Sequence, residues 1–545
     1  MFNAATRVPA PRNEPVLPYA PGDPAREELK AALRKMAGER PEIPLVIGGK
    51  HVRTGKVREA RMPHRHQHLL ATYHEADAEH VQQAIAAAMA ARKEWSLTPF
   101  QERAAIFLRA AELLSTRYRP VMNAATMLGQ SKTAFQSEID SIGEAADFLR
   151  FNVHFAQQLL ESQPLSDAGI WNLMDYRPLD GFVLAVAPFN FTAITMNLCT
   201  APAIMGNTVL LKPASTAMPS AWLVMEILRE AGLPDGVVNF IPGRGSVTGK
   251  VALTHPDLGG IHFTGSTPVF QEMWRTVGEH IASYRQYPRL VGETGGKDFI
   301  FAHPSAADDL DALATAIVRG GFEYQGQKCS ACSRVYVPES MWGKLKGRLQ
   351  EWIAELKVGD VQDFRNFMGA VIDEASFQNV STYIELVKKS PDASIVAGGE
   401  TDRREGWFVR PTLVQVQNPR HRVMCEEIFA PLVSLHVYPD ARYEETLRLC
   451  DETAPYALTG AIFARDRKAI VTASNALRHA AGNFYINDKP TGAMVGQQPF
   501  GGSRASGTND KSGSMLNLVR WTSPRTVKEN LAPPTRFGYP FMGAE

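Results

Sequence analysis

Cys329 lies in the part of this sequence whose residue types are best suited to chemistry. The segment reads EYQGQKCSACSR (residues 323–334) and places Cys329 three residues before Cys332. A thiolate is a strong nucleophile, and two cysteines at this spacing can also form a redox pair or half of a zinc site. The other three cysteines, Cys199, Cys425 and Cys450, are isolated. We therefore expect no zinc site and interpret Cys332 as a buried structural cysteine.

Three alternating histidines, His64, His66 and His68, form the other candidate metal cluster. No acidic or cysteine cluster accompanies them, and a metal site needs such a set of ligands. We interpret this segment as the solvated start of a strand and expect no metal in the protein.

Two glycine-containing turns are candidate phosphate-binding sites. Residues 243–249 (GRGSVTG) follow an apolar run, but the spacing is one residue longer than the dinucleotide fingerprint, so a plain strand-to-helix turn explains it equally well. Residues 263–267 (FTGST) end a second apolar run and precede a helical pattern. Free amides and the helix dipole would favour a pyrophosphate beside Gly265 and Ser266, although Ser266 could also be an ordinary helix cap.

The composition excludes several functional classes. The chain has 545 residues, enough for two or three domains. Lys and Arg together number 58 and Asp and Glu 57, so the formal net charge of +1 gives no reason to expect nucleic acid or an anionic membrane as a partner. We also expect no membrane span, because no apolar run approaches the required length of about 20 residues. The few cysteines favour a reducing compartment, the cytoplasm by default, or the mitochondrial matrix in a eukaryote.

The hydrophobic pattern predicts the elements that must position these residues. Residues 1–60 are rich in proline and charge, with one short helix near 26–37, and we expect an N-terminal arm there. Helical periodicity follows at 80–95, 101–118 and 137–160. Between 181 and 296 short apolar runs alternate with helical stretches, which is typical of a buried parallel sheet with crossover helices. A second α/β series begins near residue 297.

Three motifs, taken together, resemble the active-site set of the aldehyde dehydrogenase superfamily. They are PFNF (residues 188–191), ETGGK (293–297) and GQKC (326–329), in that order along the chain. The resemblance implies an α/β fold with a Rossmann-type NAD-binding domain (61–164 and 181–296), an α/β catalytic domain (297–514) and a small β oligomerisation flap (165–180 with 515–545).

The chemistry of aldehyde oxidation explains these residue types. Hydride leaves an aldehyde carbon readily only after a nucleophile has made that carbon tetrahedral, and Cys329 is the expected nucleophile. The Asn190 amide and the Cys329 N–H can stabilise the resulting oxyanion. Loss of hydride leaves a thioester, and Glu293 can deprotonate the water that hydrolyses it.

The same resemblance implies a cofactor site for NAD. Lys212 matches a contact to the adenosine ribose, Gly265 and Ser266 match the pyrophosphate site, and Glu427 and Phe429 match residues that hold the nicotinamide ribose. One departure concerns Ser215, because many NAD-preferring members have Glu at that position. A 2′-phosphate would meet less repulsion from serine, so we expect some tolerance of NADP.

Within the superfamily, the chain is most similar to the 1-pyrroline-5-carboxylate dehydrogenases over nearly its whole length. The segment YINDKPTGA (residues 485–493) resembles their aldehyde anchor loop. By this resemblance, Ser330 and the amides of Gly492 and Ala493 bind the substrate carboxylate, which charge-assisted hydrogen bonds would favour. Phe191 and Phe500 match the aromatic pair around the aliphatic chain.

The implied activity is NAD-dependent oxidation of L-glutamate γ-semialdehyde to L-glutamate, the second step of proline degradation. The implied assembly is a homodimer or a higher homo-oligomer that acts on a small-molecule substrate. Three alternatives stay open: another semialdehyde dehydrogenase of the superfamily, a protein that has kept the fold and lost activity, and a dithiol redox protein that uses Cys329 and Cys332.

Overall fold

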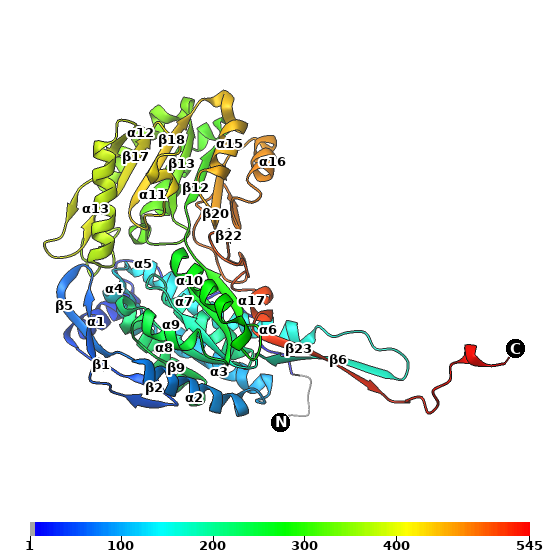
Figure 1. The fold of residues 1–545 in the computed structure, drawn as a ribbon. Coiled ribbons are helices and arrows are strands. Elements are labelled where there is room, and N and C mark those ends of the chain that lie inside the picture. Colours follow the sequence, from blue (N-terminus) through cyan, green and yellow to red (C-terminus); the bar gives the residue numbers. More distant parts are fainter. Residues whose placement is uncertain (1–5, 545) are drawn as a thin grey trace.

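A seven-stranded sheet organises the first domain of the computed structural model, which describes residues 6–544 (Figure 1). Its strand order is β11-β10-β7-β8-β9-β2-β3, and the five strands from β11 to β9 are parallel. These are the five apolar runs that we expected to form a parallel sheet. The strands are β2 (Leu45–Ile47), β3 (Lys50–Val52), β7 (Phe182–Val186), β8 (Thr208–Lys212), β9 (Val238–Phe240), β10 (Leu258–Thr264) and β11 (Arg289–Glu293).

Both faces of this sheet are buried, which explains its continuous apolar strands. In β7, Val183 and Ala185 join one hydrophobic cluster, whereas Phe182 and Leu184 join another on the opposite face. The covering helices are α2 (Ala78–Trp95), α3 (Phe100–Ser115), α4 (Arg119–Gln130), α6 (Ala145–Glu161), α7 (Thr192–Ile204), α8 (Met218–Glu230), α9 (Gly245–Ala252) and α10 (Thr267–Glu279).

The N-terminal segment differs from the expected arm. It contains α1 (Pro24–Gly38), as predicted, but β2 and β3 add two antiparallel strands to the edge of the first sheet. Leu45 and Ile47 are buried against the same core as Phe182, and this apolar contact draws the segment into the sheet. Residues 6–23, the described part upstream of α1, lack regular secondary structure.

A second seven-stranded sheet forms the other lobe (Figure 1), in the order β14-β17-β18-β13-β12-β20-β21. Its strands are β12 (Asp298–Ala302), β13 (Cys332–Pro338), β14 (Ala393–Ala397), β17 (Thr412–Val416), β18 (Leu432–Tyr438), β20 (Thr459–Phe463) and β21 (Asn483–Ile486). Only the edge strand β14 is antiparallel to its neighbour. The flanking helices are α11 (Leu310–Phe322), α12 (Glu339–Glu355), α13 (Glu374–Lys389), α15 (Tyr443–Glu452) and α16 (Arg467–Ala476).

A long two-stranded ribbon projects from the first domain and carries the C-terminal tail (Figure 1). It pairs β6 (Ile170–Pro178) antiparallel with β23 (Thr522–Asn530), from the far end of the chain. Trp171 on this ribbon is 58% exposed. Within the described residues, no helix combines the length and apolar character needed to cross a bilayer.

The helix expected at 137–160 is interrupted by a π-helical turn. α5 (Ala134–Ser137) leads into η1 (Glu138–Glu144), and α6 continues the helix. Within η1, the buried Asp140 accepts hydrogen bonds from the amides of Thr192 (3.0 Å) and Ala193 (2.9 Å). It also pairs with the Lys132 ammonium at 2.6 Å. The wider turn thus carries a carboxylate to the start of α7.

His64 is buried, so the expectation of a solvated strand start was wrong. It lies in the turn between β4 (Val57–Met62) and β5 (Arg65–His74), which packs against the second domain. Its Nδ1 lies 3.1 Å from Ser131 Oγ, and its Nε2 lies 3.5 Å from an Asp360 oxygen. Burial lowers the pKa of His64 to about 4. His66 stacks on Trp407 of the second domain, so this turn joins the two lobes.

Asn207 ties the start of β8 to the C-terminal part of the chain and provides a test of the first domain. Its side chain accepts a hydrogen bond from the Leu179 amide and donates to the carbonyls of Pro202 and Trp521, each at 2.9 Å. We expect Asn207→Ala to lower the free energy of unfolding by about 2–4 kcal/mol, because buried backbone groups lose their partners. The urea unfolding midpoint of the full chain measures this loss.

Asn172→Ala is the matched control for this test, because the Asn172 amide donates to the Leu165 carbonyl at the exposed ribbon. An Asn207→Ala midpoint equal to that of the control would contradict the proposed role.

Candidate functional site

The three motif residues come from both domains and lie at the ends of their sheets. Asn190 follows β7, and Glu293 is the last residue of β11, so both lie at the carboxyl edge of the first sheet. Cys329 belongs to the second domain and precedes β13. Ligands of open α/β sheets bind at this edge, and the site is therefore built between the lobes.

The turn before Cys329 has an unusual backbone conformation. Tyr324, Gln325 and Gly326 have φ angles of 51°, 56° and 65°, in the left-handed region. Such residues cost roughly 1–3 kcal/mol each when they are not glycine. The Gln325 amide offsets this cost by donating to the carbonyls of Ser131 (3.0 Å) and Ala370 (2.7 Å). The nucleophile loop is thus attached to both domains.

Asn190 contacts the same loop. Its amide nitrogen donates to the Gln327 carbonyl at 3.1 Å, two residues before Cys329. Gln327 in turn accepts from the Ile372 amide at 2.8 Å through its side chain. An amide donor therefore lies beside the backbone that presents the sulfur.

Glu293 rests against the segment at 501–507. One carboxylate oxygen accepts from the Gly502 amide at 3.2 Å. Burial raises the pKa of Glu293 well above its ordinary value, and the nearby Asp510 carboxylate raises it further. A carboxyl group with a raised pKa is a better proton acceptor once ionised.

The surroundings of Cys329 disfavour ionisation of its sulfur. Burial raises the pKa of Cys329 above its ordinary value, and the acidic groups of Asp298, Glu293 and Glu427 add to this effect. Ionisation of the sulfur therefore needs a base or a cationic ligand in the cleft.

The predicted nicotinamide-ribose residues share a narrow pocket with the nucleophile. Glu427, Phe429 and Cys329 all line it. The Glu427 carboxylate accepts from the Gly296 amide at 2.9 Å. Phe429 has a φ of 58° and packs edge-on against Phe189, with ring centroids 5.8 Å apart.

The other predicted cofactor residues lie at neighbouring strand ends. Lys212 ends β8, Ser215 begins a short 3-10 turn after it, and Gly265 follows β10, with β7 between the two strands. Ser266 precedes α10 without capping its amides by a side-chain hydrogen bond. The helix N-terminus therefore suits a pyrophosphate. Gly265 N donates to the Glu293 carbonyl at 3.2 Å, which links this site to the predicted base.

The predicted substrate residues also converge. The Ser330 hydroxyl donates to the Thr491 hydroxyl at 2.8 Å, which brings the predicted anchor loop beside the nucleophile. The next residue, Gly492, has a φ of 99°, a conformation that favours glycine. Ala493 follows it. Phe500 is held by two backbone hydrogen bonds to Ser512 at 3.0 and 2.7 Å.

Phe191 is packed against groups that sequence reasoning missed. The Lys132 ammonium lies 4.0 Å from the centroid of the Phe191 ring and 4.4 Å from that of Tyr324. Glu144, at the end of η1, is a half-buried carboxyl group near Lys132. Burial raises the pKa of Glu144 to about 8, with Asp140 as a second cause. The one sequence signal that could have indicated these groups was the presence of several acidic residues in an otherwise apolar helix pattern.

Comparison with known proteins identifies the family. The model of the aldehyde dehydrogenase family matches residues 52–527. The chain belongs to this family. The mitochondrial delta-1-pyrroline-5-carboxylate dehydrogenase of Dictyostelium discoideum is 52% identical over 542 residues, which cover 99% of this chain and 97% of that protein. The enzyme of the same name from Bos taurus is 49% identical, over 97% of this chain and 94% of its own length.

A solved structure agrees with this assignment. The Delta-pyrroline-5-carboxylate dehydrogenase from Mycobacterium tuberculosis, crystallised with NAD, is 51% identical, and the match covers all of both chains with a TM-score of 0.96. The expected aldehyde dehydrogenase fold is therefore confirmed. The roles of the individual site residues remain predictions.

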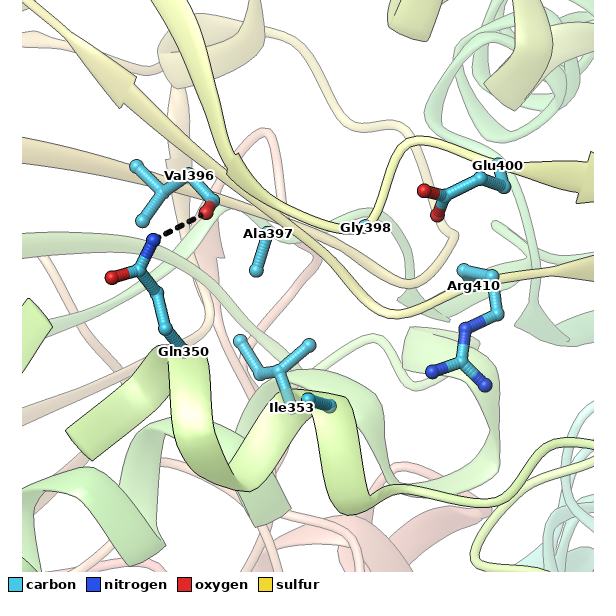
Figure 2. A pocket seen from close by; sticks show the side chains of 8 residues that line it. Gln350, Ile353, Val396, Ala397, Gly398, Glu400 and Arg410 are labelled. Carbon is cyan, nitrogen blue, oxygen red and sulfur yellow. Dashed lines mark hydrogen bonds between the residues drawn. The ribbon is translucent and has the colours of Figure 1, made fainter. Parts of the chain in front are cut away.

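This aldehyde dehydrogenase has a second, open pocket in its second domain (Figure 2). It lies between α12 and the segment around β14, and Gln350 donates there to the Val396 carbonyl at 3.0 Å. Its rim carries Glu400 and Arg410. None of its lining residues belongs to the predicted site, so this pocket lies apart from the predicted chemistry.

The pKa of Cys329 gives a direct test of the cleft. Because this pKa is raised, only a small fraction of the sulfur is ionised at pH 7, and that fraction grows about tenfold per pH unit below the pKa. We expect iodoacetamide to alkylate Cys329 of the cofactor-free protein at a rate that is still rising at pH 9. The rate is measured by mass spectrometry of peptide fragments, which distinguishes alkylation of Cys329 from alkylation of Cys332.

Free cysteine is the control for the alkylation test, because its rate levels off near its pKa of about 8.5. A plateau for Cys329 below pH 8 would show that the sulfur is ionised without a ligand.

Proposed function

We propose that the protein oxidises L-glutamate γ-semialdehyde, the open form of 1-pyrroline-5-carboxylate, to L-glutamate with NAD as the oxidant. This is the second step of proline degradation. The observation that carries the proposal is the hydrogen bond between Ser330 and Thr491, which joins the nucleophile to a loop of carboxylate-binding type. The names of the relatives, at about half sequence identity over nearly the full chain, support the same substrate.

The reaction begins with a base removing the proton from Cys329 and the sulfur bonding to the aldehyde carbon. The resulting oxyanion receives hydrogen bonds from the Asn190 amide and the Cys329 N–H. In well-studied enzymes, one such donor is worth about 3–4 kcal/mol. The carbon is now tetrahedral and can release its hydrogen with both bonding electrons.

NAD, when bound, supplies the acceptor for this hydride. Lys212, Gly265 and Ser266 would hold its adenosine ribose and pyrophosphate, and Glu427 and Phe429 its nicotinamide ribose. The pocket that Glu427 and Phe429 share with Cys329 fits this role.

Glu293 completes the reaction. Loss of hydride leaves a thioester on Cys329, and Glu293 takes a proton from water so that the hydroxide attacks the thioester carbon. The C–S bond breaks, the carboxylic acid leaves, and the thiolate is restored. Because the pKa of Glu293 is raised, the ionised base is lost as the pH falls through that raised value, and the rate falls with it.

The predicted site has polar groups suited to the two ends of an amino acid. The Ser330 hydroxyl and the amides of Gly492 and Ala493 would hold the substrate carboxylate. Glu144 is the opposing group, because an ammonium beside it would offset its desolvation and lower its pKa. Phe191 and Phe500 would contact the aliphatic chain between the two ends.

A steady-state assay of the full chain with NAD tests the proposal. We expect kcat/KM for glutamate semialdehyde to exceed that for succinate semialdehyde and for hexanal by at least about tenfold, or about 1.4 kcal/mol, within the worth of one hydrogen bond to a charged group. Cys329→Ala should abolish NADH formation. A higher kcat/KM for either comparison aldehyde would reject the substrate, and activity retained in Cys329→Ala would reject the mechanism.

Ser215 supports a secondary use of NADP. It is uncharged and lies just after β8, where an acidic side chain would repel a 2′-phosphate. The dithiol alternative has less support, because Cys332 is fully buried at the start of β13.

For assembly we propose a homodimer or a higher homo-oligomer formed through the flap at 165–180 and 515–545. The projecting ribbon with its exposed Trp171, and the exposed Phe537 and Phe541 on the tail, support this proposal. For location we propose the cytoplasm, or the mitochondrial matrix in a eukaryote, because all five cysteines are free. Light scattering of the full chain should give at least twice the subunit mass, and a monomer at micromolar concentration would contradict the assembly.

A further inference from the structure

The N-terminal segment at 6–19, which we call the strap, lies along the first domain and contacts the segment that follows the predicted anchor loop. Glu14 pairs with Arg119 at 2.9 Å and with Arg150 at 2.6 Å, and all three side chains are largely buried. Further along, the Tyr19 hydroxyl donates at 2.7 Å to Glu138 in the π-helical turn. These contacts hold the strap in one place on the domain.

Asn13 is the point at which the strap contacts residues 495–497, which directly follow the anchor loop. Its amide nitrogen donates to the Val495 carbonyl at 2.9 Å and to an Asp147 oxygen at 2.7 Å. Its amide oxygen accepts from the Gln497 side chain at 2.9 Å. Val495 is two residues after Ala493, so one side chain joins the loop to α6 and to the strap.

The other hydrogen bonds of this segment are internal to it: the Met494 amide donates to the Gln498 side chain at 3.0 Å, and the Met494 carbonyl accepts from the Gln497 and Gln498 amides at 3.0 and 2.9 Å. The packing against α6 is apolar. Gly496 has a φ of 81° and lies so close to the Phe151 ring of α6 that a Cβ would be 2.1 Å from it. Apolar packing of this kind limits the distance between loop and helix but does not set the orientation of peptide groups. Across residues 6–544, Asn13 is the one hydrogen-bond donor to the Val495 carbonyl.

We propose that Asn13 is a positioning residue for the substrate carboxylate, and that the strap thereby contributes to specificity. This inference rests on the proposed function. By holding the Val495 peptide, Asn13 sets the direction in which the amides of Gly492 and Ala493 point. It touches neither the cofactor residues nor Cys329, so its effect is confined to aldehydes that carry the carboxylate.

Kinetics of Asn13→Ala with two aldehydes tests this role. We expect KM for glutamate semialdehyde, and the inhibition constant of the product L-glutamate, to rise by about tenfold, the size expected when one charge-assisted hydrogen bond is misaligned. The values of kcat, KM for NAD and kcat/KM for hexanal should stay within about twofold, because the reacting groups are unchanged.

Gln157→Ala is the matched control. The Gln157 side chain accepts from the Val8 amide at 2.6 Å, so this variant also removes a contact of the strap but none with the anchor loop. It should leave the ratio of kcat/KM for the semialdehyde to kcat/KM for hexanal unchanged. If Asn13→Ala fails to fold, Gln497→Ala tests the role from the other side. It removes the donor to the Asn13 amide oxygen, and this bond helps to orient the Asn13 side chain toward the Val495 carbonyl.

The outcomes separate the two hypotheses. A wild-type enzyme that does not prefer the semialdehyde rejects the proposed function itself. If the wild-type enzyme prefers the semialdehyde, the role of Asn13 is tested separately. It is overturned if the Asn13→Ala and Gln497→Ala variants lose activity equally on both aldehydes, or if they lose none.

Discussion

The position of the nucleophile depends on a strained turn that is attached to both domains. The left-handed residues at 324–326 would relax if the hydrogen bonds of Gln325 were lost. One of these bonds goes to Ser131 in the first domain and the others go to residues 369 and 370 in the second. Docking of the lobes therefore supports the shape of the turn and, through it, the position of Cys329.

Loss of solvent dominates the electrostatics of the cleft. Lys132 and Asp140 form a buried pair, in which opposite charges partly compensate each other's loss of solvent. Glu293, Glu144 and Cys329 have no such cationic hydrogen-bonding partner among the described side chains, and burial raises the pKa of each. A cleft of this kind favours ligands that bring positive charge, and both the ammonium of an amino acid and an oxidised nicotinamide ring do so.

Much of the fold followed from the sequence, because its strongest signals are local. The runs that became β7 to β11 are apolar on both faces, and two separate cores account for this pattern. The short strands β2 and β3 escaped prediction, since three apolar residues beside a charged segment are a weak signal and their pairing with β9 is long-range. The π-helical turn was also missed. It adds one residue to a single turn, and the polar and apolar residues there already alternate too irregularly for the hydrophobic pattern to show it.

The site was predictable to a similar degree. Cys329, Glu293 and Asn190 stand in motifs. Lys132 and Asn13 belong to none of these motifs, and Glu144 has only the weak signal of acids in an apolar helix pattern, because the packing of distant segments sets the positions of all three. The prediction for His64 failed for the opposite reason. The polar segment around it predicted exposure to solvent, but contact with the second domain buries the side chain.

The pairing of β6 with β23 has a consequence for the growing chain. The first domain's sheet is finished once residue 293 has emerged, but β6 has no partner until residues 522–530 are made, and Trp521 then fills a gap in the core of that same domain. While the second domain is being synthesised, the nascent chain therefore has an unpaired strand edge at β6 and an incomplete hydrophobic core in the first domain. Chaperone binding during translation would protect this half-finished surface, and truncation near the C-terminus would leave it exposed permanently.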